Sequence, residues 1–119
     1  MKEESLIKKH EYYTALFDFY ENLFTEKQKQ YFSDFYFYDL SLSEIAKNHN
    51  ISRSAVFDAI DKIHKLLEDY EDKLSLYKKF KDREKIYNEY LNKYSIQSDV
   101  NQDEDNIVCD LINKLKDID

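Results

Sequence analysis

The chain contains neither glycine nor proline among its 119 residues. The absence of glycine excludes the glycine-rich phosphate loop, the dinucleotide-binding fingerprint and the nucleophile elbow, because each motif needs glycine at fixed positions. Tight hairpin turns that depend on glycine are excluded as well. A chain without helix breakers that is rich in Lys, Glu, Leu and Asp is typical of an all-α fold.

Cysteine and long apolar runs are also scarce. The single cysteine, Cys109, excludes an internal disulfide and a multi-cysteine zinc site, and it suits a reducing compartment. No apolar run reaches the roughly 18–20 residues of a membrane span, and residues 1–9 lack the apolar segment of a signal peptide. We therefore expect a cytoplasmic protein without a membrane partner, in which Cys109 is a buried small hydrophobe.

The net charge of −7 is unevenly distributed. Residues 41–67 carry four basic and three acidic side chains, and residues 68–93 carry seven of each. Acidic side chains outnumber basic ones in residues 1–40 and 94–119. A strong nonspecific nucleic-acid binder normally has a basic face. This sequence offers only a weak one, in its middle segment.

Apolar residues recur at helical spacing along most of the chain. Two helix starts carry a capping box, Thr25 with Gln28 and Ser41 with Glu44. The sequence predicts helices over residues 5–24, from Thr25, over 42–48, from Arg53, and over 106–118. Residues 95–105 are polar and acidic and are expected to form a linker. The predicted organisation is a domain over 1–94 and an acidic linker with a short tail helix over 95–119.

The helix that begins at Arg53 meets no breaker before about Ser95. A continuous helix over residues 53–94 would be about 63 Å long, which is too long to bury itself in a small domain. Either it bends back near residues 80–84, where its apolar stripe blurs, or it packs against a second copy. The regular stripe makes a helical seam possible, and we expect a homodimer.

Residues 40–63 form a helix-turn-helix pattern, LSLSEIAKNHNISRSAVFDAIDKI. Ala46 is small where the two helices approach, and Asn50 stands where the turn needs a left-handed backbone. Ser52 can cap the second helix. Ile45, Val56 and Ile60 are expected to close the small core. The fold class is thus all-α, a helix-turn-helix with a long C-terminal helix.

The sequence resembles the YlxM-like family of small bacterial helix-turn-helix proteins, whose motif is similar to region 4 of sigma factors. The resemblance spans roughly residues 12–92, and its most specific pieces are FDFY at 17–20, KQKQY at 27–31 and SRSAVFD at 52–58. It implies a regulatory role. It also implies a link to the signal recognition particle pathway, because genes of this family typically neighbour those of the particle's GTPase and its receptor.

The second helix of the motif has an outward face with both signs of charge. Its residues are Arg53, Ser54, Phe57, Asp58, Asp61, Lys62 and Lys65. On DNA, Arg53 and Ser54 would reach base edges or phosphates, and Lys47, Lys62 and Lys65 would lie near phosphates. The alternative is a solvated face with two i,i+4 pairs, Asp58–Lys62 and Asp61–Lys65, worth about 0.2–0.5 kcal/mol each.

An exposed aromatic side chain such as Phe57 more often contacts another protein than a base edge. The alternative is that Phe57 packs against the aromatic helix that precedes the motif.

Two functions follow as hypotheses. The first is a regulatory protein that binds a protein or RNA component of the signal recognition particle. The alternative is a DNA-binding transcriptional regulator that acts as a dimer. The sequence shows no catalytic constellation, and we expect no enzyme activity, no cofactor and no metal.

Overall fold

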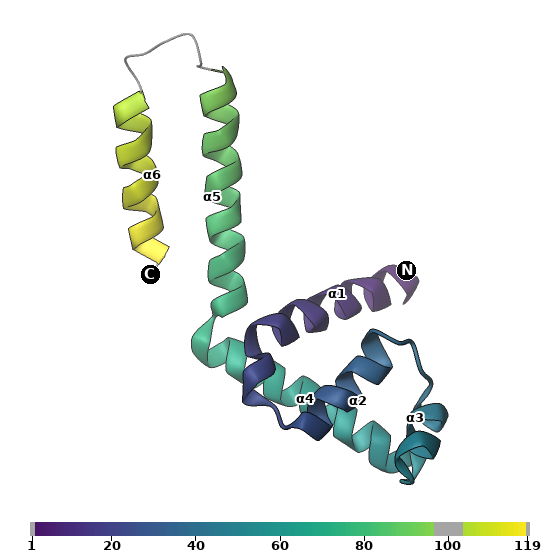
Figure 1. Cartoon of the computed structure of the whole chain (residues 1–119). Coiled ribbons are helices and arrows are strands. Elements are labelled where there is room, and N and C mark those ends of the chain that lie inside the picture. The colour runs from purple at the N-terminus through teal and green to yellow at the C-terminus, as the bar shows by residue number, and fades with distance from the viewer. Residues whose placement is uncertain (1, 97–103, 119) are drawn as a thin grey trace. The chain divides into compact units, whose positions relative to one another are not determined.

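The computed structural model describes residues 2–96 and 104–118, with side chains placed over 9–93 and 106–118. Within these ranges every regular element is helical, which confirms the predicted all-α fold (Figure 1). The elements are α1 (Lys2–Tyr20), η1 (Glu21–Leu23), α2 (Glu26–Tyr36), α3 (Leu42–His49), α4 (Arg53–Leu74), α5 (Leu76–Ile96) and α6 (Glu104–Ile118). The chain divides into two compact units, residues 1–74 and 75–119.

Side-chain caps fix the starts of α2 and α3, as predicted. The Thr25 hydroxyl accepts from the Gln28 amide at 3.1 Å, and the Gln28 side chain accepts from the Thr25 amide at 3.0 Å. Ser41 and Glu44 form the same reciprocal pair. The first helix ends earlier than predicted, at Tyr20, because the backbone must turn through η1 and become extended at Phe24 before the cap.

α3, the following turn and α4 form the predicted helix-turn-helix. Asn50 has φ 54° and ψ 44°, the left-handed conformation expected of it. The Ile51 amide donates to the Ala46 carbonyl at 3.0 Å and the Asn50 amide donates to the Lys47 carbonyl at 3.4 Å. These two bonds close the C-terminus of α3 in a Schellman motif. The Ser52 hydroxyl then accepts from the Ala55 amide at 3.1 Å and starts α4.

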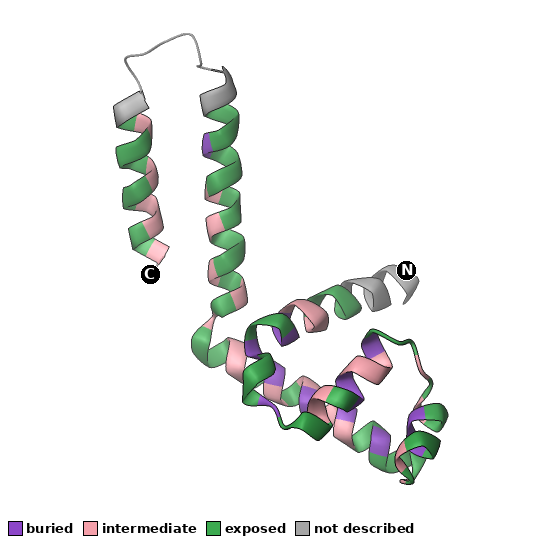
Figure 2. Cartoon of the chain, viewed as in Figure 1, coloured by how far each residue is buried: buried purple, intermediate pink, exposed green. Residues whose placement is uncertain are grey.

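The core of the first unit forms around α4. α1, α2 and α3 each pack against this helix. Four side chains of α4, spaced by three or four residues, are buried: Val56, Ile60, Ile63 and Leu67. Figure 2 shows buried residues on each of the four helices. The rings of Phe17 in α1 and Phe32 in α2 stack with centroids 4.0 Å apart. The predicted core residues Ile45, Val56 and Ile60 are thus confirmed as buried.

His64 of α4 joins α1 and α2. Its ring stacks on Tyr13 of α1 with centroids 4.0 Å apart, and its Nε2 lies 2.5 Å from the hydroxyl of Tyr36 in α2. The Tyr13 hydroxyl donates to Glu68 Oε1 at 2.6 Å. Burial lowers the pKa of His64, although Asp61 and Glu68 act in the opposite direction. Burial also raises the pKa of Tyr36 to about 12. The cluster therefore favours uncharged rings.

The expected long helix is interrupted at Ser75. α4 ends at Leu74 and α5 begins at Leu76, and Ser75 between them has φ 55°. The Ser75 carbonyl accepts the first helical hydrogen bond of α5, from the Lys79 amide at 2.9 Å. A bend near residues 80–84 was the wrong position, because that segment lies inside α5.

The second unit is a hairpin of α5 and α6, which run antiparallel and pack against each other (Figure 1). The predicted tail helix over 106–118 is confirmed as α6, which begins at Glu104. The expectation of a buried Cys109 was wrong, since its side chain is exposed on α6. Ile107 and Leu111 of α6 are partly buried and line the groove between the two helices, whereas Cys109 is absent from that lining.

The division between the two compact units falls at residues 74 and 75. The sequence places the organisational boundary after residue 94, with a linker over 95–105. Most of that linker lies outside the residues that the structure describes, so the linker stays a prediction.

Substitutions at Asn50 test the left-handed turn. Asn50→Ala is expected to be less stable than Asn50→Gly by about 1 kcal/mol. The Cβ of alanine makes positive φ unfavourable, whereas glycine has no Cβ and adopts positive φ freely. Urea denaturation measures the difference. Asn48, inside α3, is the matched control, and there alanine should be the more stable replacement. If alanine were the more stable replacement at both positions, the left-handed conformation of Asn50 would be contradicted.

Acid should destabilise the first unit through His64. Its pKa is lowered from 6.5 in the folded chain, so the unfolded chain takes up the proton first as the pH falls. The free energy of unfolding is therefore unaffected by His64 above about pH 6.5, and it falls as the pH is lowered below that value. Urea denaturation of the wild type and of His64→Gln at about pH 7.5 and pH 5 measures this. The wild type should lose more stability than the variant. An equal loss in both proteins would contradict a role of His64.

Candidate partner-binding face of the helix-turn-helix

The outward surface of α3 and of residues 53–65 of α4 forms the candidate face. The structure places all seven predicted site residues there in exposed positions: Lys47, Arg53, Ser54, Phe57, Asp58, Lys62 and Lys65. Val56, Ile60 and Ile63 alternate with them and are buried. The helical period therefore separates a core stripe from a solvent stripe on the same helix.

The charges on this face are partly paired. Lys65 Nζ lies 2.9 Å from Asp61 Oδ2, which confirms one predicted i,i+4 pair. This hydrogen bond raises the pKa of the exposed Lys65 amine. The other predicted pair, Asp58–Lys62, is absent from the ion pairs of the described residues. The face thus keeps cations at Arg53 and Lys62 beside carboxylates that would repel phosphate.

The N-terminus of α4 uses its hydroxyl groups for capping. Ser52 Oγ accepts from the Ala55 amide, and it lies 3.2 Å from Ser54 Oγ. The predicted contact residue Ser54 therefore has a neighbour within hydrogen-bond distance already. Arg53, one residue earlier, is exposed at the first position of the helix. Of these two residues, the structure leaves Arg53 the better placed to reach a partner.

Phe57 lies at the edge of a groove of about 160 Å³. The groove is lined by Phe35 of α2, Leu42 of α3, and Phe57, Ile60, Asp61 and His64 of α4. The Phe57 side chain remains 57 % exposed, so it is not tucked away against α2. An exposed ring beside an apolar groove is a suitable anchor point for a partner's apolar side chain.

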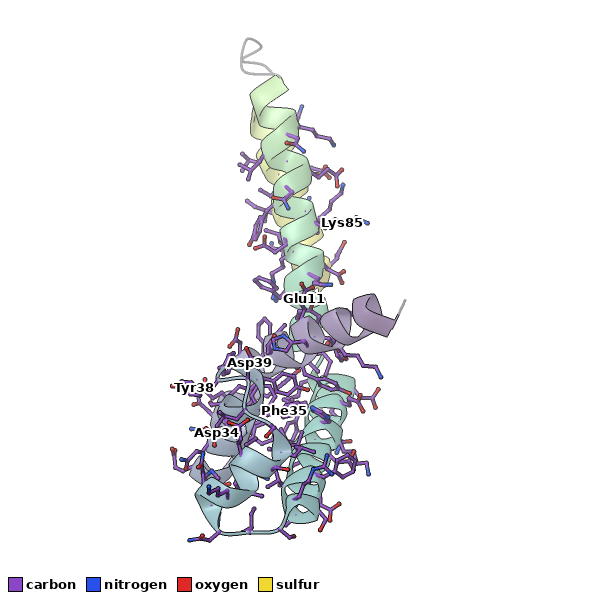
Figure 3. The ribbon with its side chains drawn as sticks, turned by 90° about the vertical axis from the view of Figure 1, so that its right-hand side faces the viewer. Glu11, Asp34, Phe35, Tyr38, Asp39 and Lys85 are labelled. Carbon is purple, nitrogen blue, oxygen red and sulfur yellow. The ribbon has the colours of Figure 1, made fainter. Side chains whose placement is uncertain are left out.

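A second groove adjoins the first, because Phe35 and His64 line both. It has a volume of about 390 Å³ and is otherwise lined by Lys9, His10, Tyr13 and Tyr36. Figure 3 shows Phe35 further in than Tyr38, which lies at the outer edge of the α2–α3 connection and is 71 % exposed. Sequence reasoning did not assign Phe35, Leu42 or His64 to the site, since they come from three different helices.

The three histidines serve as contacts between helices. His10 Nε2 lies 3.1 Å from the Tyr36 carbonyl, His49 Nε2 lies 3.0 Å from Asp34 Oδ2, and His64 contacts Tyr36. Each of them thus attaches another helix to α2. Among the residues that the structure describes, no group of three or more His, Cys, Asp or Glu side chains could hold a metal ion. None of the described helices is long and apolar enough to span a membrane.

Comparison with known proteins places this geometry in a family. Residues 7–107 match the model of the family UPF0122, described as "putative helix-turn-helix protein, YlxM / p13 like". A UPF0122 protein of Bacillus licheniformis is 53 % identical over 72 residues, which cover 60 % of this chain and 67 % of the relative. The protein YlxM of Bacillus subtilis is 51 % identical over 73 residues, or 61 % of this chain and 66 % of YlxM.

A longer match is found with a UPF0122 protein of Bacillus thuringiensis, which is 43 % identical over 93 residues. That match covers 78 % of this chain and 84 % of the relative, whereas the first relatives are matched over about two thirds of their length. The family match extends beyond the helix-turn-helix at both ends. The chain belongs to the UPF0122 family of YlxM- and p13-like helix-turn-helix proteins.

Proposed function

We propose that this chain is a cytoplasmic regulatory protein that binds a protein or RNA component of the signal recognition particle through the α3–α4 face. The observation that carries the proposal is Phe57, a large aromatic side chain exposed beside an apolar groove on an otherwise polar helix-turn-helix. The choice of the particle comes from the resemblance to the YlxM-like family, whose genes lie beside those of the particle's GTPase and receptor.

The charge of the face favours such a partner over duplex DNA. Asp58 and Asp61 stand among the cations of α4, and Lys65 is paired with Asp61. A duplex places one phosphate charge about every 1.7 Å along its axis, so carboxylates at the contact weaken binding. A protein surface, or an RNA loop with unstacked bases, can use an exposed ring such as Phe57 directly.

Alanine substitutions at Phe57 and Arg53 test the face. The double variant Arg53→Ala, Phe57→Ala should remain folded, because both side chains are exposed. It should lose about tenfold or more of its affinity for the partner, as expected for an aromatic and an arginine at the centre of an interface. The measurement is a pull-down from the source lysate, with and without nuclease, that identifies the retained proteins and RNA.

The matched control is Leu23→Ala, Lys27→Ala, which changes the same number of exposed residues on another part of the first unit. It should retain the partner at the wild-type level. Recovery of the particle's GTPase or RNA with the control, but not with the double variant, is the expected result. Equal recovery with both variants would show that the α3–α4 face is not the binding site.

The second candidate function is a DNA-binding regulator that acts as a dimer. It is favoured by Arg53 at the start of the second helix of a well-formed helix-turn-helix. In this case Asp58→Asn, Asp61→Asn should bind duplex DNA several-fold more tightly than the wild type, because two repulsive charges are removed. Affinity should fall steeply with salt, as fluorescence anisotropy would measure. No binding at about 50 mM salt would eliminate this function.

A further inference from the structure

The second unit spans residues 75–119, and its described helices α5 and α6 have almost no buried core. Among its described side chains only Tyr90 is buried, at 4 % exposure, and the other buried side chains of the chain belong to the first unit. A pair of helices with one buried side chain gains little from packing, and helices in water depend on packing for most of their stability. The α5–α6 hairpin therefore needs another surface to cover it.

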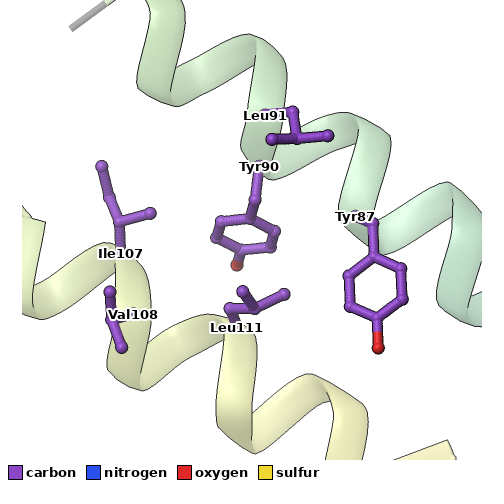
Figure 4. Close-up of a pocket in the computed structure, with 6 residues that line it drawn as sticks. All are labelled: Tyr87, Tyr90, Leu91, Ile107, Val108 and Leu111. Atoms are coloured by element: carbon purple, nitrogen blue, oxygen red, sulfur yellow. The ribbon is translucent and has the colours of Figure 1, made fainter. Parts of the chain in front are cut away.

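The uncovered surface is apolar and lies along the seam of the two helices. A groove of about 290 Å³ is lined by Tyr87, Tyr90 and Leu91 of α5 and by Ile107, Val108 and Leu111 of α6 (Figure 4). Leu91 is 65 % exposed and Val108 is 52 % exposed. Tyr87 with Leu91 and Val108 with Ile112 are spaced by four residues, so each helix presents a continuous exposed stripe.

We propose that a second copy of this chain covers the groove, so that two α5–α6 hairpins form an antiparallel four-helix bundle. In a two-fold symmetric dimer each copy contributes the same apolar stripes to the interface, and no apolar stripe is left to bind a third copy. Four-helix bundles of this kind are common, and their core consists of apolar side chains that recur at helical spacing on each helix. This inference does not depend on the partner of the α3–α4 face.

Charge favours a second copy as the occupant. α5 carries six basic and three acidic residues, whereas α6 carries four acidic and two basic ones. In the antiparallel bundle each α5 can lie beside the α6 of the other copy, which places opposite net charges together. Within one chain, the polar contacts between the two helices centre on Tyr90, whose hydroxyl donates to Asp110 and whose ring lies under the Lys114 amine.

This surface differs from the dimer seam that the sequence suggests. The sequence places that seam on the apolar stripe of residues 53–94, but Val56, Ile60, Ile63 and Leu67 of this stripe are buried in the first unit. They are therefore occupied within the single chain. Of the same stripe, Tyr87 and Leu91 remain exposed, and α6 adds Val108 and Ile112. The proposal therefore keeps the predicted homodimer but places its interface on the α5–α6 hairpin.

The test is the mass of the full chain in solution, measured by sedimentation equilibrium over a range of concentrations. One chain has a mass of 14.5 kDa, and the wild type is expected to have twice that mass. The variant Leu91→Glu, Val108→Glu is expected to be monomeric, with its dissociation constant raised about 100-fold or more. Each charge enters the apolar contact twice in a dimer, so the penalties accumulate.

The control is Leu23→Glu, which changes another exposed leucine, in the first unit, and should leave the dimer unchanged. A wild type that is monomeric at all concentrations overturns the proposal, and so does a dimer that survives Leu91→Glu, Val108→Glu. Hydrogen exchange of the wild type covers the case in which that variant fails to fold. Protection should rise with concentration in α5 and α6 alone, and a rise confined to α3 and α4 would place the contact elsewhere.

Discussion

The burial of one stripe of α4 is the constraint on which the first unit depends. Val56, Ile60, Ile63 and Leu67 are spaced so that they face one side of the helix, and α1, α2 and α3 all pack against α4. Because this stripe is buried against the other helices of the first unit, the opposite side of α4 faces solvent. The exposure of Phe57 and the other candidate residues is therefore a consequence of core packing, and a change in the core would displace the face.

A fold without glycine must turn with other residues. In the described residues three positions have positive φ, and they are Asp39, Asn50 and Ser75. Each follows shortly after a helix and helps to end it, and polar side chains of this kind tolerate the left-handed region better than apolar ones. The ends of the helices are thus encoded by a few polar residues, and Ser75 shows how weak that signal can be in an otherwise uninterrupted helical pattern.

Each unit presents one surface that its own packing leaves incomplete. In the first unit this is the groove beside Phe57, with charges of both signs around it. In the second unit it is the purely apolar and aromatic seam of α5 and α6. A mixed surface suits a partner that is bound and released, whereas an apolar seam between helices resembles a permanent contact. In the two proposals, recognition of a partner and assembly of two copies therefore use separate surfaces.

The sequence alone determined the helix-turn-helix and the starts of α2, α3 and α4, because the capping boxes, the turn at Asn50 and the cap at Ser52 involve residues at most five positions apart. It also identified the exposed residues of α4, since a helical period separates two sides. Only the tertiary structure decided which side chains meet across helices. His64 reaches Tyr36, 28 residues away, and the groove beside Phe57 joins three helices. Such contacts depend on how the helices pack, which local patterns do not encode.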